Sequence, residues 1–151
     1  MGIKNSRDFD LLTLGQLLLR LSPPDNERLS RGDTFVKQVG GAELNVAVGA
    51  ALLGLHTGVI SKLPAHDIGS FMKGKIRSFG VSDDFFMYDQ SSSARVGIYY
   101  YENGAYPRKP KVIYDRNNSS FFSLNIDEIP EEVYTASKCF HTTGITLALN
   151  E

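Results

Sequence analysis

A run of small and apolar residues over positions 40–54 constrains the fold of this chain more than any other segment. It opens with Gly40-Gly41, closes with Gly54, and between them consists mostly of Ala, Val and Leu. This pattern predicts a helix that begins after a glycine turn and ends at a glycine cap. Because the run holds so few polar residues, we expect the helix to be buried nearly all round, with its alanines against a sheet.

Short apolar segments on both sides of this helix predict the sheet. Residues 10–14 and 57–61 have the composition of buried strands, and a helix over 67–79, capped by Asp67, precedes a further strand at 84–88. A capped amphipathic segment at 126–136 and a last strand at 138–143 complete the series. Strands that alternate with helices are typical of a parallel sheet covered by helices, so the sequence predicts the α/β class.

A second, more exposed kind of strand is expected at 17–21, 34–39, 95–102 and 111–116. The first is a short apolar run, the second alternates imperfectly between apolar and polar residues, and the last two are aromatic and β-branched. The last two form a hairpin with a long, basic tip. These strands, within 16–39 and 94–117, suit a small sheet that stands off the main body like a lid. Sites that exclude water are often covered in this way.

Composition excludes several classes of protein. The net charge of −1 gives no excess of positive charge for binding nucleic acid. No apolar run is long enough for a membrane span. One cysteine, Cys139, expected to be buried and inert, rules out an internal disulfide and fits a reducing compartment. The first ten residues are too charged for a signal peptide, so we expect a cytoplasmic location. Three scattered histidines give no metal-ligand spacing, so no metal site is expected.

The glycine turn and one amide form the first candidate site. Gly40 and Gly41 allow close backbone approach, and the following helix start offers unpaired N–H groups to an anion or a hydroxyl-rich ligand. Asn45 is the one amide in an apolar helix, and a buried amide needs a hydrogen-bond partner. The same residues would also serve tight packing alone, with Asn45 bonded to backbone, and the residues themselves leave both interpretations open.

The predicted hairpin supplies the second candidate site. Five of the seven tyrosines lie in or beside it, among them Tyr99 and Tyr114. Tyr114 and Arg116 are two residues apart on a strand and therefore share a face, where a phenol beside a guanidinium makes a carboxylate receptor. Cross-strand packing of the tyrosines and a solvated arginine are the alternatives.

Five segments of the chain resemble one family in their order along the sequence. They are LTLGQLLLRLSPP, QVGGAELNVAVGAALLGLHTGVISKL, VGIYYYE, VIYDRNNSS and FHTTGITLAL. The chain resembles the PfkB, or ribokinase-like, carbohydrate kinases over essentially its whole length, and within them it is most similar to the 2-keto-3-deoxygluconate kinases. Val96 and Asp115 stand where that branch more often has Thr and Tyr, which leaves the exact sugar acid open.

The resemblance implies a Rossmann-like α/β domain with helices on both faces of its parallel sheet and a β-sheet lid. It also implies transfer of the γ-phosphoryl group of ATP, with Mg²⁺, to the terminal hydroxyl of a small-molecule sugar acid. The residues that match the substrate-binding positions of the branch are Gly41, Tyr99, Tyr114, Arg116 and Ile145. Lids of this family often pair between subunits, so a homodimer through the lid is expected.

The family's Gly-Ala-Gly-Asp element, which carries the catalytic base, has no match in residues 1–151. We therefore expect the chain to be the truncated N-terminal portion of such a kinase, with no catalytic residue of its own and without the ATP-binding half. As a fragment it is expected to bind no cofactor and to be inactive. Two alternatives stay open: a kinase for fructose, ribose or a nucleoside, and a non-catalytic module for sugar binding or dimerisation.

Overall fold

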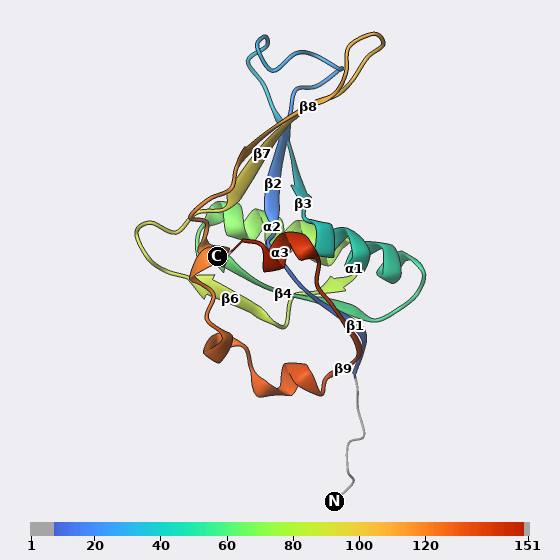
Figure 1. Cartoon of the computed structure of the whole chain (residues 1–151), viewed down its shortest axis with the longest axis vertical. Coiled ribbons are helices and arrows are strands. Elements are labelled where there is room, and N and C mark those ends of the chain that lie inside the picture. Colours follow the sequence, from blue (N-terminus) through green and yellow to red (C-terminus); the bar gives the residue numbers. More distant parts are fainter. Residues whose placement is uncertain (1–7, 150–151) are drawn as a thin grey trace, which may run out of the picture.

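Two β-sheets make up the fold, which a computed structural model describes over residues 8–149 (Figure 1). The N-terminal stretch on which the expectation about a signal peptide rests lies largely outside these residues. The first sheet has the order β5-β4-β1-β9, and β6 pairs with the carboxyl-terminal half of β4. Every pairing in this sheet is parallel. Its strands are β1 (Phe9–Leu14), β4 (Thr57–Pro64), β5 (Val81–Ser82), β6 (Phe86–Asp89) and β9 (Ser137–His141).

The first sheet is covered by helical segments on both faces. The helices α1 (Ala42–Leu52) and α2 (Asp67–Ser78) pack on one face, where Leu44, Met72 and Val59 share one apolar cluster. Three short 3₁₀ helices cover the other face, where Val133 packs on Leu12 and Ile60 of the sheet; they are η1 (Ser120–Ser123), η2 (Ile126–Glu128) and η3 (Glu131–Tyr134). Strands buried on both faces must be apolar throughout, which explains the composition of β1 and β4. The α/β class predicted from the sequence is confirmed.

Helix α1 is less buried than its composition suggests. Only Glu43, Leu44 and Ala47 are buried, whereas Leu52 is 78% exposed. The helix rests by one face on the first sheet, mainly on β1 and β4, and much of its opposite surface is exposed. The expectation of a helix buried nearly all round is therefore wrong, although Gly54 follows its end with a positive φ of 89°, as a glycine cap should.

The second sheet stands away from the first, at the upper part of the molecule (Figure 1). It has the order β3-β2-β7-β8, with strands β2 (Leu18–Ser22), β3 (Val36–Gly40), β7 (Gly97–Glu102) and β8 (Lys111–Asp115). β7 and β8 form the predicted antiparallel hairpin, and β2 lies parallel to β7. At its base, Leu19 of β2 joins the apolar cluster around α2, which fixes this sheet on the body of the protein.

Three local expectations need correction. His66, not Asp67, is the N-cap of α2, since its ring nitrogen accepts from the Ile68 N–H. The amphipathic segment at 126–136 forms 3₁₀ turns with a capping box at Asn125 rather than one helix. Cys139 is exposed, because β9 has a single neighbour and lies at the edge of the first sheet.

Within the described residues, no helix combines the length and the apolar composition that crossing a bilayer requires.

Candidate functional site

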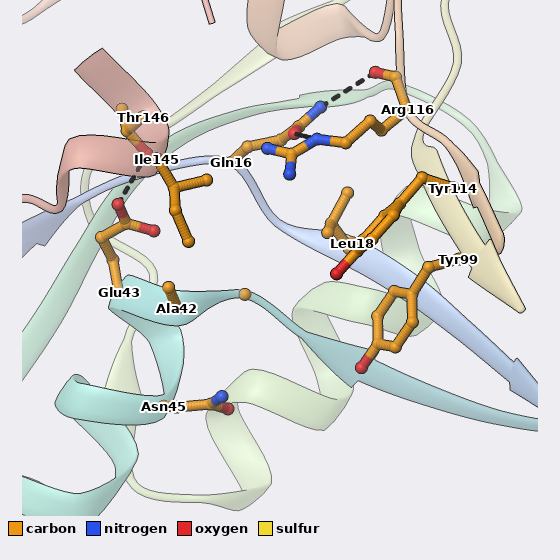
Figure 2. A pocket seen from close by; sticks show the side chains of 11 residues that line it. Gln16, Leu18, Ala42, Glu43, Asn45, Tyr99, Tyr114, Arg116, Ile145 and Thr146 are labelled. Atoms are coloured by element: carbon orange, nitrogen blue, oxygen red, sulfur yellow. Dashed lines mark hydrogen bonds between the residues drawn. The ribbon is translucent and has the colours of Figure 1, made fainter. Parts of the chain in front are cut away.

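A cavity of about 230 Å³ lies where the amino end of α1 meets the second sheet and the short helix α3 (Gly144–Leu147). Figure 2 shows the side chains around it. All six residues singled out from the sequence line this cavity: Gly41, Asn45, Tyr99, Tyr114, Arg116 and Ile145. Five further residues also line it: Gln16, Leu18, Ala42, Glu43 and Thr146. The structure thus brings together residues from five separate segments of the chain.

The glycine turn allows the chain to approach this cavity closely. Gly41 has a φ of 148°, a conformation that side chains rarely adopt, and an added Cβ would lie 2.8 Å from the backbone oxygen of Gln16. A Cβ on Gly40 would lie 2.6 Å from the Tyr99 hydroxyl. Gly41 is also the N-cap of α1, and it has no side chain that could accept hydrogen bonds from the first N–H groups of the helix. This end of the helix lies at the wall of the cavity.

Asn45 is exposed rather than buried, which corrects the expectation of a buried amide that must find a partner. It lies on a face of α1 that packs on neither β1 nor β4. Figure 2 places it at the lower edge of the cavity, beyond Ala42. An amide in this position keeps both donor and acceptor groups available for a ligand.

Tyr99 of β7 and Tyr114 of β8 are direct cross-strand partners, with ring centroids 5.9 Å apart. The cross-strand packing interpretation is therefore confirmed, and both tyrosines also line the cavity, where their part in ligand binding stays a prediction. Burial raises the pKa of the Tyr99 phenol above its ordinary value, with a smaller contribution from Tyr114 in the same direction and an opposing one from Arg20. The phenol accordingly stays protonated at neutral pH and able to donate a hydrogen bond.

Arg116 follows β8 directly, and its guanidinium lies 5.8 Å from the centroid of the Tyr114 ring. Its Nε donates to Oε1 of Gln16 at 2.8 Å. Among the described residues no carboxylate pairs with Arg116, and neighbouring Asp115 pairs with Arg95 instead, at 2.8 Å. The cavity therefore contains a cation without a protein counter-ion.

Glu43 connects α1 to the segment after β9. Glu43 is only 2% exposed. Its Oε1 accepts hydrogen bonds from the N–H and hydroxyl of Thr143 and from the hydroxyl of Thr146. The two hydroxyl distances are both 2.6 Å. These bonds hold the start of α3, and with it Ile145, against the cavity.

Burial opposes ionisation of Glu43, but the hydrogen bonds from Thr143, Thr146 and backbone N–H groups outweigh it and hold the pKa of this carboxyl below its ordinary value of 4.5. A depressed pKa means that the carboxylate stabilises the fold above the ordinary value and that this contribution is lost as the pH falls through the folded-state pKa. Glu43 is thus an ionised structural group at neutral pH.

We expect Glu43→Gln to lower the free energy of unfolding by about 1–3 kcal/mol near neutral pH, because an amide cannot replace a carboxylate that accepts several hydrogen bonds. The difference from the wild type should shrink as the pH falls below about 4.5, where the wild-type carboxyl also becomes protonated. Urea unfolding of both proteins across this range measures it. A difference that is independent of pH would contradict the role of the charge.

Gln16 and Glu43 were missed as site residues, although the sequence holds a signal for each. Gln16 interrupts an apolar stretch, and Glu43 is the one charged residue of the run over 40–54. A polar residue in such surroundings requires a partner. The partners themselves lie about a hundred positions away and carry no local signal.

No three His, Cys, Asp or Glu side chains among residues 8–149 lie close enough together to hold a metal ion.

Comparisons with known proteins agree with this geometry. A 2-dehydro-3-deoxygalactonokinase from Haloferax volcanii is 37% identical over 142 residues, which cover 94% of this chain and 44% of that protein. A 5-dehydro-2-deoxygluconokinase from Bacillus cereus is 32% identical over 146 residues, or 96% of this chain and 43% of that protein. The crystal structure of a 2-dehydro-3-deoxygluconokinase from Thermotoga maritima matches with a TM-score of 0.88 and 37% identity, over 95% of this chain and 43% of that one.

The chain spans less than half the length of these relatives. Residues 8–151 match the family described as pfkB family carbohydrate kinase, which is nearly the whole chain. The chain therefore belongs to the PfkB family of carbohydrate kinases.

Proposed function

We propose that this chain is the substrate-binding part of an ATP-dependent kinase that phosphorylates the terminal hydroxyl of 2-keto-3-deoxygluconate or a closely similar sugar acid. The observation that carries the proposal is the meeting, in one cavity, of a guanidinium that no carboxylate of the described residues pairs with, two phenols and the amino end of α1. The three relatives named above support it, since each is named as a kinase of a dehydro-deoxy sugar acid.

Each group of the cavity has a chemical part in this proposal. Arg116 receives the carboxylate, because its planar guanidinium offers paired N–H donors. The hydroxyls of Tyr99 and Tyr114 and the amide of Asn45 hydrogen-bond to hydroxyl and keto oxygens of the sugar. The cavity volume of about 230 Å³ lies below the roughly 300–1,000 Å³ typical of pockets for small molecules, which favours a ligand as small as a sugar acid.

The proposal assigns no catalytic base to the described residues. Glu43 is the one carboxylate that the described residues place at the cavity. Although burial opposes its ionisation, hydrogen bonds from Thr143 and Thr146 hold its pKa below the ordinary value, which makes it a weak base near neutral pH. A general base needs a carboxylate that can reach the substrate hydroxyl. The base, the phosphate-binding groups and Mg²⁺ are therefore assigned to parts of the protein beyond residues 8–149, and the residues described here bind and orient the acceptor.

Calorimetric titration with a small panel of ligands tests this function. We expect 2-keto-3-deoxygluconate or its galactonate isomer to bind at least about tenfold more tightly than fructose, ribose or a nucleoside, because only the acids offer a carboxylate to Arg116. Tighter binding of a neutral sugar would favour the alternative kinase. Sugar acid binding without ATP-dependent formation of a phosphorylated product in the complete protein would favour a non-catalytic module.

We also propose that a second copy of the chain pairs through the second sheet. Its outer strands β3 and β8 have open edges, and apolar side chains are exposed near and along them, including Phe35, Val36, Val112 and Ile113. Exposed edges and apolar patches of this kind favour association. Neighbouring residues of a strand point to opposite faces, so Val112 and Ile113 sample both faces of this sheet.

The double replacement Val112→Lys/Ile113→Lys is expected to shift the protein from dimer to monomer, because it places charge on both faces. Sedimentation equilibrium over a concentration series measures the change. Leu52→Lys/Leu53→Lys, at the exposed end of α1, is the matched control and should leave the association unchanged. A wild-type protein that stays monomeric at every concentration contradicts the pairing.

A further inference from the structure

Gln16 lies directly behind Arg116, in the link between β1 and β2, and is only 3% exposed. Figure 2 shows its amide between the backbone carbonyl and the guanidinium of Arg116. We propose that Gln16 is a positioning residue that fixes the Arg116 guanidinium so that its two terminal nitrogens receive the carboxylate of the ligand. The proposal rests on the proposed function for the identity of that ligand.

Three hydrogen bonds fix the orientation of the Gln16 amide. Its Nε2 donates to the backbone oxygen of Arg116 at 3.1 Å and to Oγ of Ser119 at 2.7 Å, and its Oε1 accepts from Nε of Arg116 at 2.8 Å. Both N–H donors of the amide are therefore used. A flipped amide would set Oε1 against a carbonyl oxygen and Nε2 against an N–H donor, so only one orientation satisfies the partners.

Gln16 is closely packed. A Cβ on Gly97 would lie 3.0 Å from Nε2 of Gln16, and a Cβ on Gly41 would lie 2.8 Å from its backbone oxygen. The absence of a side chain at Gly97 thus leaves room for the amide, and at Gly41 for the backbone of Gln16. Ser119, which receives the second N–H, is itself buried.

The consequence for Arg116 follows from the shape of a guanidinium. A carboxylate can pair side-on, with Nε and one terminal nitrogen, or end-on, with both terminal nitrogens. Because Nε of Arg116 already donates to Gln16, a carboxylate cannot pair side-on with this arginine, and only the edge with the two terminal nitrogens remains for it. Among the described residues, no acceptor is bonded to those terminal nitrogens. A long side chain that is already held in its binding geometry also loses less freedom when the ligand arrives.

The test compares Gln16→Leu, which keeps the size of the side chain and removes its hydrogen bonds, with Gln90→Leu, an exposed glutamine away from the cavity. Ser119→Ala is a milder second variant that removes one partner of the amide. Two ligands are titrated by calorimetry, 2-keto-3-deoxygluconate and its neutral methyl ester. In parallel, the ¹⁵N NMR signal of the Arg116 Nε–H, assigned by its loss in Arg116→Lys, reports whether the guanidinium is held.

We expect Gln16→Leu to weaken binding of the acid about tenfold, to change binding of the ester less than about twofold, and to make the Nε–H signal exchange rapidly. Ser119→Ala should weaken binding of the acid about threefold or less and should speed the exchange of the Nε–H signal less than Gln16→Leu does. Gln90→Leu should change neither the affinities nor the signal. Equal weakening of acid and ester with an unchanged Nε–H signal would overturn the proposal, as would wild-type behaviour of Gln16→Leu.

Failure of the proposed function gives a different result. In that case the wild type binds neither the acid nor its ester, while the Nε–H signal is slow to exchange in the wild type and fast in Gln16→Leu. Such a result supports the positioning of Arg116 by Gln16 and rejects the sugar acid as its ligand.

Discussion

Arg116→Ala is expected to weaken binding of 2-keto-3-deoxygluconate by about 100-fold or more. A hydrogen bond to a charged group contributes about 1.5–3 kcal/mol, and a paired guanidinium supplies two such bonds to one carboxylate. Because no carboxylate among the described residues pairs with Arg116, its removal leaves no protein charge unpaired. In the complete protein the loss should appear as a higher KM for the sugar acid, with the KM for ATP unchanged.

Arg77→Ala is the matched control, since Arg77 lies on the exposed surface of α2 away from the cavity. It should leave the affinity for the sugar acid within about twofold of the wild type. Calorimetry with the acid and its methyl ester separates loss of the charge contact from a general loss of the cavity. An unchanged affinity for the acid in Arg116→Ala would reject the role of Arg116 as carboxylate receptor.

Gly41→Ala is expected to have the largest effect on stability, a decrease of about 2 kcal/mol or more in the free energy of unfolding. A residue with a side chain costs about 1–3 kcal/mol in a backbone region that glycine alone occupies readily, and Gly41 has a φ of 148°. The added methyl group would also lie 2.8 Å from a backbone oxygen, which cannot move as a flexible side chain can. Since Gly41 begins α1, we expect ligand binding to be lost as well.

Gly49→Ala offers a control within the same helix. Apart from its chain neighbours and the backbone of its own helix, no atom of the described residues lies within 4 Å of the position that a Cβ on Gly49 would occupy. Alanine is the better helix former, so this replacement should stabilise the protein by about 0.5–1 kcal/mol. Urea unfolding of the two variants and the wild type measures both effects. Equal stability of Gly41→Ala and the wild type would show that the turn tolerates a side chain.

Much of the cavity could be predicted from the sequence, because its parts lie at places that local patterns mark. The glycine doublet marks the start of α1, and the hairpin pattern brings Tyr99 opposite Tyr114. Two-residue spacing then places Arg116 near Tyr114, as the guanidinium-to-ring distance of 5.8 Å shows. That Ile145 lines the same cavity was implied only by the family resemblance, since it matches a position that lines the substrate pocket of that family. That these residues bind a sugar acid stays a prediction.

Two features of the site could not be predicted, because they depend on contacts between distant segments. Gln16 and Arg116 are 100 residues apart, and so are Glu43 and Thr143. A sequence shows that each of these polar residues needs a partner but does not show which one. The exposure of Asn45 was also missed, because apolar composition predicts that α1 is buried but not on how many sides.

The residues that line the cavity come from distant segments of the sequence, so binding of a ligand there is coupled to the folding of the whole chain. Residues 16, 41–45, 99, 114–116 and 145–146 meet only when β1, α1, the second sheet and α3 are all in place. A ligand that recognises this wall has nothing to hold in the unfolded chain, so by mass action it stabilises the native state by RT ln(1 + [L]/Kd). A ligand at about 100 times its Kd then contributes about 2.7 kcal/mol, a substantial part of the 5–15 kcal/mol, roughly, by which proteins are stable. A ligand that fills this cavity would therefore raise the free energy of unfolding of the whole chain, not only of the residues that it contacts.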